Sequence, residues 1–533
     1  MSVVNVSGTL TVPESSRYDR STKLTKPVKV RDRKLRAQVR HADDNYKDAL
    51  KAARATELLL TEEVGYLEPE GPLERTYKVT QSDLRRNVDV TTAQRGFSLS
   101  LLDFGPYCAV DFTRNGRKLL IAGRKGGHVA AFDFREGGLD TELHLNETVR
   151  CARYLHNDQY FAVAQKKYVY IYDKAGVELH CLRKHIEVTG MEFLPYHFLL
   201  ATVGNAGWLK YTDTSTGNDV VELRTRLGGA TAMTQNPYNA IIHLGHHNGT
   251  VSLWSPSITT PLVRMLCHKG PVRAAAVDRG GHYMATAGAD SQLKIWDVRM
   301  YKEVHAYYTP TPASALRISD RGLLAVGWGP HVTVWKDAFK TKQKSPYMTH
   351  LSPGSEVHAL GFCPFDDVLG VGHDEGYTSL IIPGAGEPNF DALEVNPYET
   401  LQQRRETEVQ GLLNKLKPEM IALDPTFIGS IDARAPDERR KALVLETTSE
   451  ADARGAAVAD KKLQPKAKMR GKNSALRRYL RKKTKNVVDD RKVRVEAALK
   501  KEKAMRETHH RTKLGLPSRE RTFGPALARF AGK

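Results

Sequence analysis

The sequence predicts an all-β fold made of seven similar units, and three observations support this prediction. Six segments end in an apolar–aromatic–polar triplet or a close variant, with central positions 132, 172, 212, 254, 296 and 335. A seventh segment, Gly376 to Pro383, parallels Gly249 to Pro256. Each unit also has an upstream apolar run and a turn rich in Gly, Asn or Asp. A period of about 40–45 residues with this ending is typical of WD repeats, so we expect a seven-bladed WD-repeat β-propeller.

The fifth unit carries the most complete blade pattern. His268 stands at its entrance, Asp290 in its turn and Trp296 in its closing strand. Thr286 lies on the strand between them. In WD proteins these residue types form a hydrogen-bonded chain that satisfies the buried polar groups of a blade. We therefore interpret His268, Thr286, Asp290 and Trp296 as a structural network and not as a hydrolase triad.

Composition divides the 533 residues into five segments. The predicted domains are a basic, helical N-terminal extension (1–64), a pre-propeller segment (65–100), the propeller (101–385), a post-propeller region with a helix (386–460) and an extended, partly helical basic tail (461–533).

Four helices are expected outside the propeller. The first spans about 33–63, because apolar residues recur there at helical spacing. Its stripe consists of Leu35, Val39, Ala42, Tyr46, Ala49, Ala53 and Leu60. The second spans Tyr398–Leu416, with an apolar side that includes Val409 and Leu413 and with Pro418 beyond its end. A charged helix is expected over Asp489–Arg506 and a shorter one after Ser474, both ordering only on a partner.

The charge distribution points to a polyanionic partner. The chain has a net charge of +20, and the tail alone holds 25 basic residues against 6 acidic ones. Between Arg17 and Arg40 there are 10 basic residues and 2 acidic ones, whereas residues 101–385 are close to neutral. Cationic arms of this kind are typical of proteins that bind nucleic acid. The tail candidates for RNA binding are Lys466, Lys468, Arg470, Lys472, Arg477, Arg478, Arg481, Lys482 and Lys483, and those near the N-terminus are Lys29, Arg31, Arg33 and Lys34.

Several functional classes are not expected. Apolar stretches are too short for a transmembrane helix, the start lacks the pattern of a secretory signal, and an intracellular protein without a membrane partner is predicted. The five cysteines are far apart, so neither a disulfide framework nor a zinc site is indicated. The glycine-rich stretch 123–128 lacks a G-K-[ST] ending and fits a turn between strands. The histidine pairs 246–247 and 509–510 lack further ligands at metal spacing. We expect no catalytic residues, cofactor, metal or small-molecule substrate.

Five segments outside the generic repeat pattern resemble a known family. They are Gly65–Gln81, Phe104–Tyr107, Gly384–Asp391, Asn396–Thr400 and Arg470–Ser474. They are similar to segments of the WD-repeat, small nucleolar ribonucleoprotein-associated subunits of the small-subunit processome, which have a characteristic C-terminal domain after the propeller. The resemblance implies a non-catalytic nucleolar scaffold in pre-18S rRNA processing and small ribosomal subunit assembly. Its implied partners are pre-rRNA or small nucleolar RNA and other processome proteins.

Two other functions are compatible with short features of the chain. Trp296-Asp297-Val298-Arg299 fits the W-D-x-R pattern of substrate receptors in cullin–RING ubiquitin ligases. This reading would give Arg299 the central role. A reader of histone tails would need an acidic propeller face, and the slight positive balance of residues 101–385 argues against it.

Overall fold

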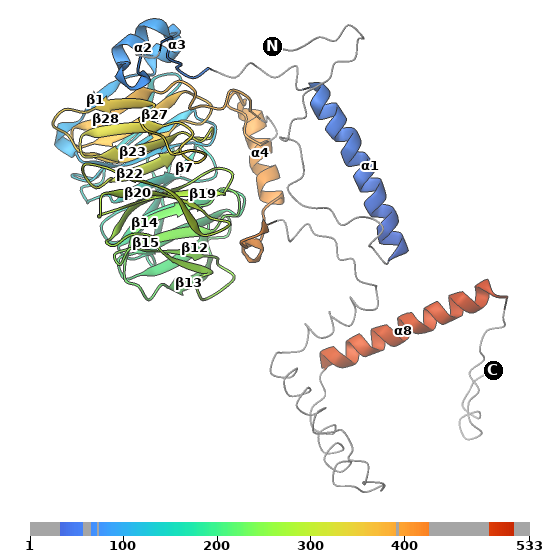
Figure 1. Ribbon diagram of the computed structural model, residues 1–533. Coiled ribbons are helices and arrows are strands. Elements are labelled where there is room, and N and C mark those ends of the chain that lie inside the picture. Colours follow the sequence, from blue (N-terminus) through green and yellow to red (C-terminus); the bar gives the residue numbers. More distant parts are fainter. Residues whose placement is uncertain (1–31, 57–64, 72–73, 391–393, 426–489, 516–533) are drawn as a thin grey trace, which may run out of the picture. The chain divides into compact units, whose positions relative to one another are not determined.

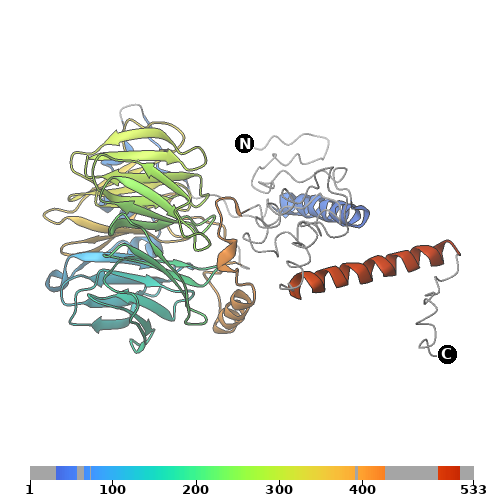
Figure 2. The same ribbon diagram turned by 90° about the horizontal axis from the view of Figure 1, so that it is seen from below.

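The computed structural model describes residues 32–56, 65–71, 74–390, 394–425 and 490–515. The chain forms two units, one of residues 56–429 and the other of residues 1–55 together with 430–533. The larger unit contains seven four-stranded antiparallel sheets arranged as the blades of a propeller (Figures 1 and 2). This arrangement confirms the predicted fold class.

Each blade consists of strands that are hydrogen-bonded in order from the inside outwards. Blades 1 and 2 contain β2 (Tyr107–Phe112), β3 (Lys118–Gly123), β4 (His128–Asp133), β5 (Gly138–His144), β6 (Cys151–Tyr154), β7 (Tyr160–Ala164), β8 (Val169–Asp173) and β9 (Glu178–Leu182). Blades 3 and 4 contain β10 (Val188–Leu194), β11 (Leu199–Gly204), β12 (Trp208–Asp213), β13 (Asp219–Arg224), β14 (Ala230–Gln235), β15 (Ile242–His246), β16 (Thr250–Trp254) and β17 (Val263–Leu266). Blades 5 and 6 contain β18 (Val272–Val277), β19 (Tyr283–Gly288), β20 (Gln292–Asp297), β21 (Lys302–Tyr308), β22 (Ala315–Ile318), β23 (Leu324–Trp328), β24 (His331–Trp335) and β25 (Met348–Leu351). Blade 7 contains β26 (Val357–Phe362), β27 (Val368–His373), β28 (Gly376–Ile381) and β1 (Ser98–Ser100).

The ring is closed by a strand from the N-terminal side of the propeller. β1 pairs antiparallel with β28, with Ser98 opposite Thr378 and Ser100 opposite Gly376. The repeat triplets therefore mark the third strand of each blade, and a fourth strand follows each of the first six. The predicted propeller start at residue 101 leaves out β1, because a three-residue strand carries no repeat signal of its own.

The antiparallel order of the strands gives the propeller two loop faces. Loops that join the first strand to the second, and the third to the fourth, emerge on one side. We call this side the strap face, because residues 394–424 cross it as a strap. Loops that join the second strand to the third, and those that lead to the next blade, emerge on the other side, which we call the rim face.

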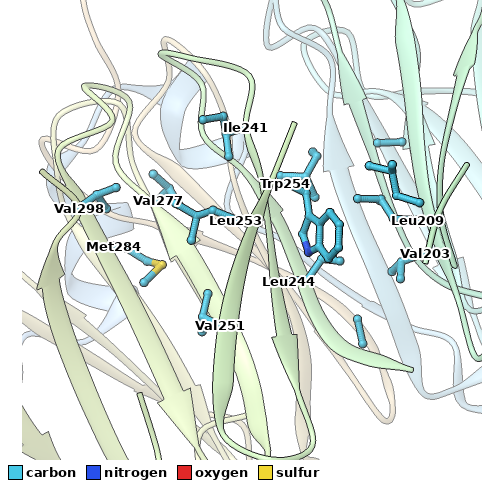
Figure 3. Close-up of a cluster of buried hydrophobic side chains, with 14 of the residues drawn as sticks. Val203, Leu209, Ile241, Leu244, Val251, Leu253, Trp254, Val277, Met284 and Val298 are labelled. Atoms are coloured by element: carbon cyan, nitrogen blue, oxygen red, sulfur yellow. The ribbon is translucent and has the colours of Figure 1, made fainter. Parts of the chain in front are cut away.

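The core lies between neighbouring blades. Trp254 at the end of β16 is 1% exposed and belongs to a cluster that continues into blades 3 and 5, with Leu209, Val277 and Met284 among its members (Figure 3). Every residue of β11 is buried. Blades thus have apolar side chains on both sheet faces, as stacked sheets require.

Side chains of the inner strands also join one blade to the next. The Thr189 hydroxyl lies 3.3 Å from the Val203 carbonyl oxygen of its own blade and 3.4 Å from that of Ala230 in the next blade. Ser314 repeats this arrangement, donating to the carbonyl oxygen of Val357 at 2.5 Å. Such bonds satisfy backbone groups that face the propeller axis.

The pre-propeller segment packs against blades 6 and 7. It contains the 3-10 helix η4 (Thr76–Lys78) and the helices α2 (Gln81–Asn87) and α3 (Val90–Gln94), and η5 (Leu102–Phe104) follows β1. Gln81 donates to the carbonyl oxygen of Ile381 at 3.0 Å and accepts from its amide at 2.9 Å. The backbone amide of Leu67 donates to the Tyr347 hydroxyl at 2.9 Å.

Two segments that carried the family resemblance meet in this region. A Cβ at Gly384, whose φ is +81°, would lie 2.5 Å from the Tyr66 ring. Only glycine combines this left-handed backbone with so close an approach. Chain segments more than 300 residues apart in the sequence therefore form one closing structure.

The helices agree with the predictions in place but differ in extent. α1 (Arg33–Thr56) has a buried Val39. The remainder of the predicted helix, residues 57–63, lies outside the described residues. α4 (Leu401–Leu413) begins after a capping box formed by Thr400 and Gln403. The C-terminal helix α8 (Asp490–Lys513) extends beyond the predicted Arg506. The helix predicted after Ser474 lies outside the described residues.

Candidate binding surfaces

A post-propeller strap, residues 394–424, crosses the strap face of blades 1 to 4. At blade 1, the Arg135 guanidinium lies 4.5 Å from the ring centroid of Tyr398 and donates to the Pro397 carbonyl oxygen at 3.3 Å. Arg114 donates to Glu394 at 3.2 Å. Figures 1 and 2 show α4 of this strap beside the propeller, in orange.

α4 turns its polar side towards the propeller. Arg404 lies 2.9 Å from the carboxylate of Asp158, a nearly fully buried residue of blade 2. The next turn places Glu408 3.1 Å from His156. The apolar side predicted for this helix is solvent-exposed, and Leu413 is 79% exposed. Arg404 and Glu408 are one helical turn apart and so lie on the same side of α4, but this spacing is equally typical of a solvated helix side.

Beyond α4, Lys415 continues the same line of polar contacts into blade 3. Its ammonium group contacts the carboxylate of Asp213 and donates to the Ser215 hydroxyl at 2.6 Å. Burial acts to raise the pKa of Asp213, but hydrogen bonds from Lys415 and Ser215 outweigh it and leave this pKa below its usual value. Asp213 is therefore a carboxylate at neutral pH, and the pair is ionic.

The strap ends on blade 4. Ile421 is 2% exposed and belongs to the cluster around Trp254. The Ser255 hydroxyl donates to the Ile421 carbonyl oxygen at 2.7 Å, and the Asn239 side chain donates to that of Leu423 at 3.3 Å. The strap thus ends at blade 4, although the last propeller strand in the sequence, β28, belongs to blade 7.

Ile421→Ala tests how this end of the strap is held. We expect docking to weaken by about 2 kcal/mol, because a buried aliphatic side chain is truncated. The Leu416 amide, which donates to the Tyr196 carbonyl oxygen at 3.0 Å, should then exchange with solvent about 30-fold faster. Leu413→Ala removes an equally large but exposed side chain and should leave this rate unchanged. Equal rates in the two variants would contradict the anchoring role.

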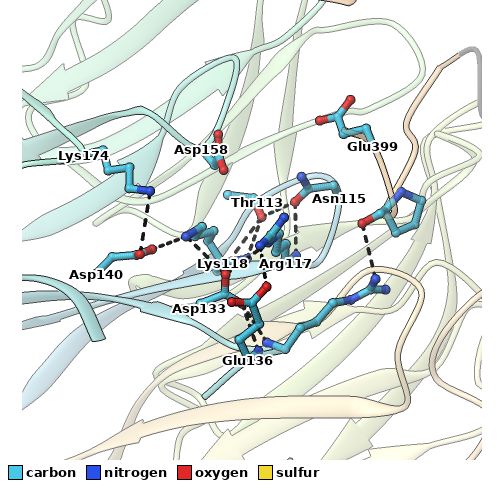
Figure 4. A network of polar contacts seen from close by, with 12 residues as sticks. Thr113, Asn115, Arg117, Lys118, Asp133, Glu136, Asp140, Asp158, Lys174 and Glu399 are labelled. Carbon is cyan, nitrogen blue, oxygen red and sulfur yellow. Dashed lines mark hydrogen bonds and ion pairs between the residues drawn. The ribbon is translucent and has the colours of Figure 1, made fainter. Parts of the chain in front are cut away.

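A pocket of about 330 Å³ lies where the start of α4 meets blades 1 and 2 (Figure 4). It is lined by Arg117, Lys118, Asp158, Lys174, Glu399, Thr400, Leu401 and Arg404. Its cations are paired within the protein: Arg117 lies 3.1 Å from Asp133, and Lys118 contacts Asp133 and Asp140. Within the described ranges there is no group of three or more His, Cys, Asp or Glu residues that could hold a metal. The pocket therefore lies at the joint between the strap and the blades.

The four residues singled out in the fifth unit are hydrogen-bonded to one another. His268 lies 3.0 Å from Asp290 through Nδ1 and 2.9 Å from the Thr286 hydroxyl through Nε2. The Trp296 indole N–H donates to the same hydroxyl at 3.0 Å. Burial lowers the pKa of His268 despite the opposing effect of Asp290, so the imidazole is neutral at pH 7.

Thr286→Val removes the hydroxyl at the centre of this network. We expect a loss of about 2 kcal/mol of stability, because the Trp296 indole N–H and a buried His268 nitrogen lose their partner. Chemical denaturation followed by tryptophan fluorescence measures this loss. Thr259→Val is the matched control, since Thr259 is exposed. A midpoint equal to that of the control would contradict the structural role of the network.

The predicted RNA-binding residues are only partly described. Arg33 and Lys34 are exposed in the first turn of α1. Lys29, Arg31 and the nine tail candidates lie outside the described residues. The RNA-binding role of these thirteen residues therefore stays a prediction.

Comparison with known proteins places the chain in a family. Residues 346–424 match the BING4CT (NUC141) domain, and residues 259–297 match the WD domain, G-beta repeat. U3 small nucleolar RNA-associated protein 7 of Saccharomyces cerevisiae is 52% identical over 97% of this chain and 96% of its own length. The chain belongs to this protein's family. WD repeat-containing protein 46 of Homo sapiens is 43% identical over 97% of this chain and 82% of its own length. The protein of the same name in Caenorhabditis elegans is 40% identical over 93% of this chain and 84% of its own length.

In this member of the U3 small nucleolar RNA-associated protein 7 family, the BING4CT domain is continuous with the propeller. The BING4CT match begins just before β25, includes β26 to β28 of blade 7 and ends with the strap at residue 424. It crosses the boundary predicted at residue 385, because the last blade and the strap form one part of the structure. No helix in the described part of the chain is long and apolar enough to cross a membrane.

The comparisons give no support to the ubiquitin-ligase alternative. Arg299, the residue on which it depends, is paired with Asp297 of the same chain at 3.1 and 3.2 Å. Its guanidinium lies 6.0 Å from the Tyr283 ring centroid. These contacts give the W-D-x-R pattern a local structural role at the end of β20.

Proposed function

We propose that this protein is a non-catalytic scaffold subunit of the small-subunit processome, acting in nucleolar pre-18S rRNA processing and small ribosomal subunit assembly. The match to U3 small nucleolar RNA-associated protein 7 carries this proposal, because it covers 97% of the chain and so includes the basic arms as well as the propeller. The partners that we assign are pre-rRNA or small nucleolar RNA and other processome proteins.

The propeller and strap support a scaffold role in physical terms. The blades form a rigid body, and the strap fixes the point at which the C-terminal arm leaves it. Residues 461–533 could span about 240 Å if extended, at about 3.3 Å per residue. Neutralisation of RNA phosphates supplies the affinity of such an arm with little base specificity. The protein would thus hold RNA at a distance from the surface that contacts other subunits.

Crosslinking the full chain to RNA in cells, followed by sequencing of the crosslinked RNA, tests the proposal. We expect reads concentrated in pre-rRNA and small nucleolar RNA, and a nucleolar signal from the tagged protein. Reads spread over messenger RNA in proportion to abundance, or a cytoplasmic signal, would overturn it.

A further inference from the structure

The rim face of blades 1 to 3 carries a cluster of exposed cations. We call it the basic rim and define it by Arg124, Lys125, Lys166, Lys167, Arg183 and Arg226. Arg124 and Lys125 lie in the loop between β3 and β4, and Lys166 and Lys167 lie in the loop between β7 and β8. Arg183 and Arg226 lie in the loops that lead to blades 3 and 4. The antiparallel order of the blades brings all these loops to one face.

The cations of the basic rim lack acidic partners. Among the described residues, none of the six side chains has an ion pair with an Asp or Glu. Their neighbour Lys184 shows the contrast, since it lies 2.7 Å from Asp219. The acidic residues in the rim-face loops of these blades are Glu147 and Glu187. The basic rim therefore has an excess of positive charge that the acidic residues in the described part of the chain do not neutralise.

The charges on the strap face of blade 1 are arranged differently. There Arg114 is paired with Glu394 at 3.2 Å, and Arg117 with Glu136 at 2.8 Å. On blade 1, therefore, the strap face has paired charges, whereas the rim-face loop carries the unpaired cations Arg124 and Lys125. On the rim face of blade 7, by contrast, the loop residues Asp374 and Glu375 are acidic.

Aromatic rings lie beside these cations. Trp208, the first residue of β12 on the rim face, is 38% exposed, with the Arg224 guanidinium 5.9 Å from its ring centroid. The Lys167 ammonium lies 5.0 Å from the ring centroid of Tyr168. Unpaired cations along a path with accessible aromatic faces are typical of single-stranded nucleic acid sites, where bases stack and phosphates are neutralised. An acidic peptide would use the cations but would not need the rings.

We propose that the basic rim binds the sugar–phosphate backbone of single-stranded RNA, independently of the basic tail. This inference rests on the proposed function, because it gives an RNA-associated scaffold a second, structured contact. RNA bound there would lie on the opposite side of the propeller from the strap. The glycine-rich stretch 123–128, excluded above as a nucleotide cradle, supplies two of the cations.

The test uses the full chain and a uridine oligonucleotide of about 20 nucleotides. Lys125→Gln, Lys166→Gln and Lys167→Gln are combined in one variant. The matched control combines Lys342→Gln, Lys344→Gln and Lys417→Gln, which remove three exposed strap-face cations that have no ion pair among the described residues. We expect the rim variant to bind about 10-fold more weakly near 0.15 M salt. The slope of log affinity against log salt concentration should become shallower by about 2. The control should bind like the unaltered chain, and all three proteins should share one thermal midpoint.

Several outcomes would overturn the basic rim as an RNA site. Equal losses in the rim and control variants would show that only net charge matters. Loss of binding to a polyglutamate peptide with unchanged RNA binding would identify an acidic protein partner instead. Unchanged RNA binding in the rim variant, together with a loss in a chain whose tail cations are replaced, would reject the basic rim while leaving the proposed function intact.

Discussion

Replacing the nine candidate cations between Lys466 and Lys483 with glutamine should lower the affinity of the full chain for single-stranded RNA at least about 100-fold near 0.15 M salt. The physical reason is the release of counterions from phosphates, which scales with the number of neutralised charges. If all nine side chains contact phosphates, the salt dependence of log affinity should become shallower by about 6 units. Fluorescence anisotropy at several salt concentrations measures both quantities.

The thermal midpoint of the propeller should not change in this variant, because the strap ends on blade 4 before the tail begins. As a control, four cations of α8 that have no ion pair among the described residues can be replaced: Lys500, Lys501, Lys503 and Arg511. A tail variant that keeps the affinity and salt slope of the unaltered chain would remove the tail from the RNA-binding mechanism. A control that loses as much affinity per charge would show that the nine candidates contribute no more than other cations of the tail.

Trp254→Ala should destabilise the propeller by about 4 kcal/mol, the largest stability effect that we expect from a single substitution. The indole is 1% exposed and packs in the cluster shared by blades 3, 4 and 5 (Figure 3). Its N–H donates to the Ser252 hydroxyl at 2.8 Å, and His246 lies 2.6 Å from the same oxygen. Truncation therefore creates a cavity and also removes one partner from a buried polar group.

Trp208→Ala provides the matched comparison, because it truncates the same side chain at a position that is 38% exposed. Guanidinium denaturation of the two variants, followed by circular dichroism, should give midpoints that differ clearly. A Trp254→Ala protein with an unaltered midpoint would mean that the interblade cluster does not limit stability.

The propeller could be predicted because each blade carries its own local pattern. Repeats of about 40 residues place an apolar run, a turn and an aromatic position at similar spacing, and the core around Trp254 and Trp296 follows from them. The network of His268 with Thr286 is also a feature of a single blade. By contrast, β1 was missed because its three residues become a strand only when they pair with β28.

The orientation of the strap could not be inferred from its own pattern. Apolar spacing alone would turn Val409 and Leu413 towards a core, whereas α4 instead presents Arg404 and Glu408 to blade 2. The reason is that His156 and Asp158, about 250 residues earlier in the chain, lie in the loop of blade 2 that α4 contacts. No local window of sequence contains both partners.

The sequence by itself determined the number of blades, the composition of the two basic arms and the family resemblance, since each depends on residues close together in the chain. Only the tertiary structure decided how the charges of the propeller are distributed between its faces. Arg114 and Arg124 are ten residues apart in the chain, yet one is paired with Glu394 and the other belongs to the basic rim. An antiparallel strand carries the chain from one face to the other, and the partners available on each face come from distant segments.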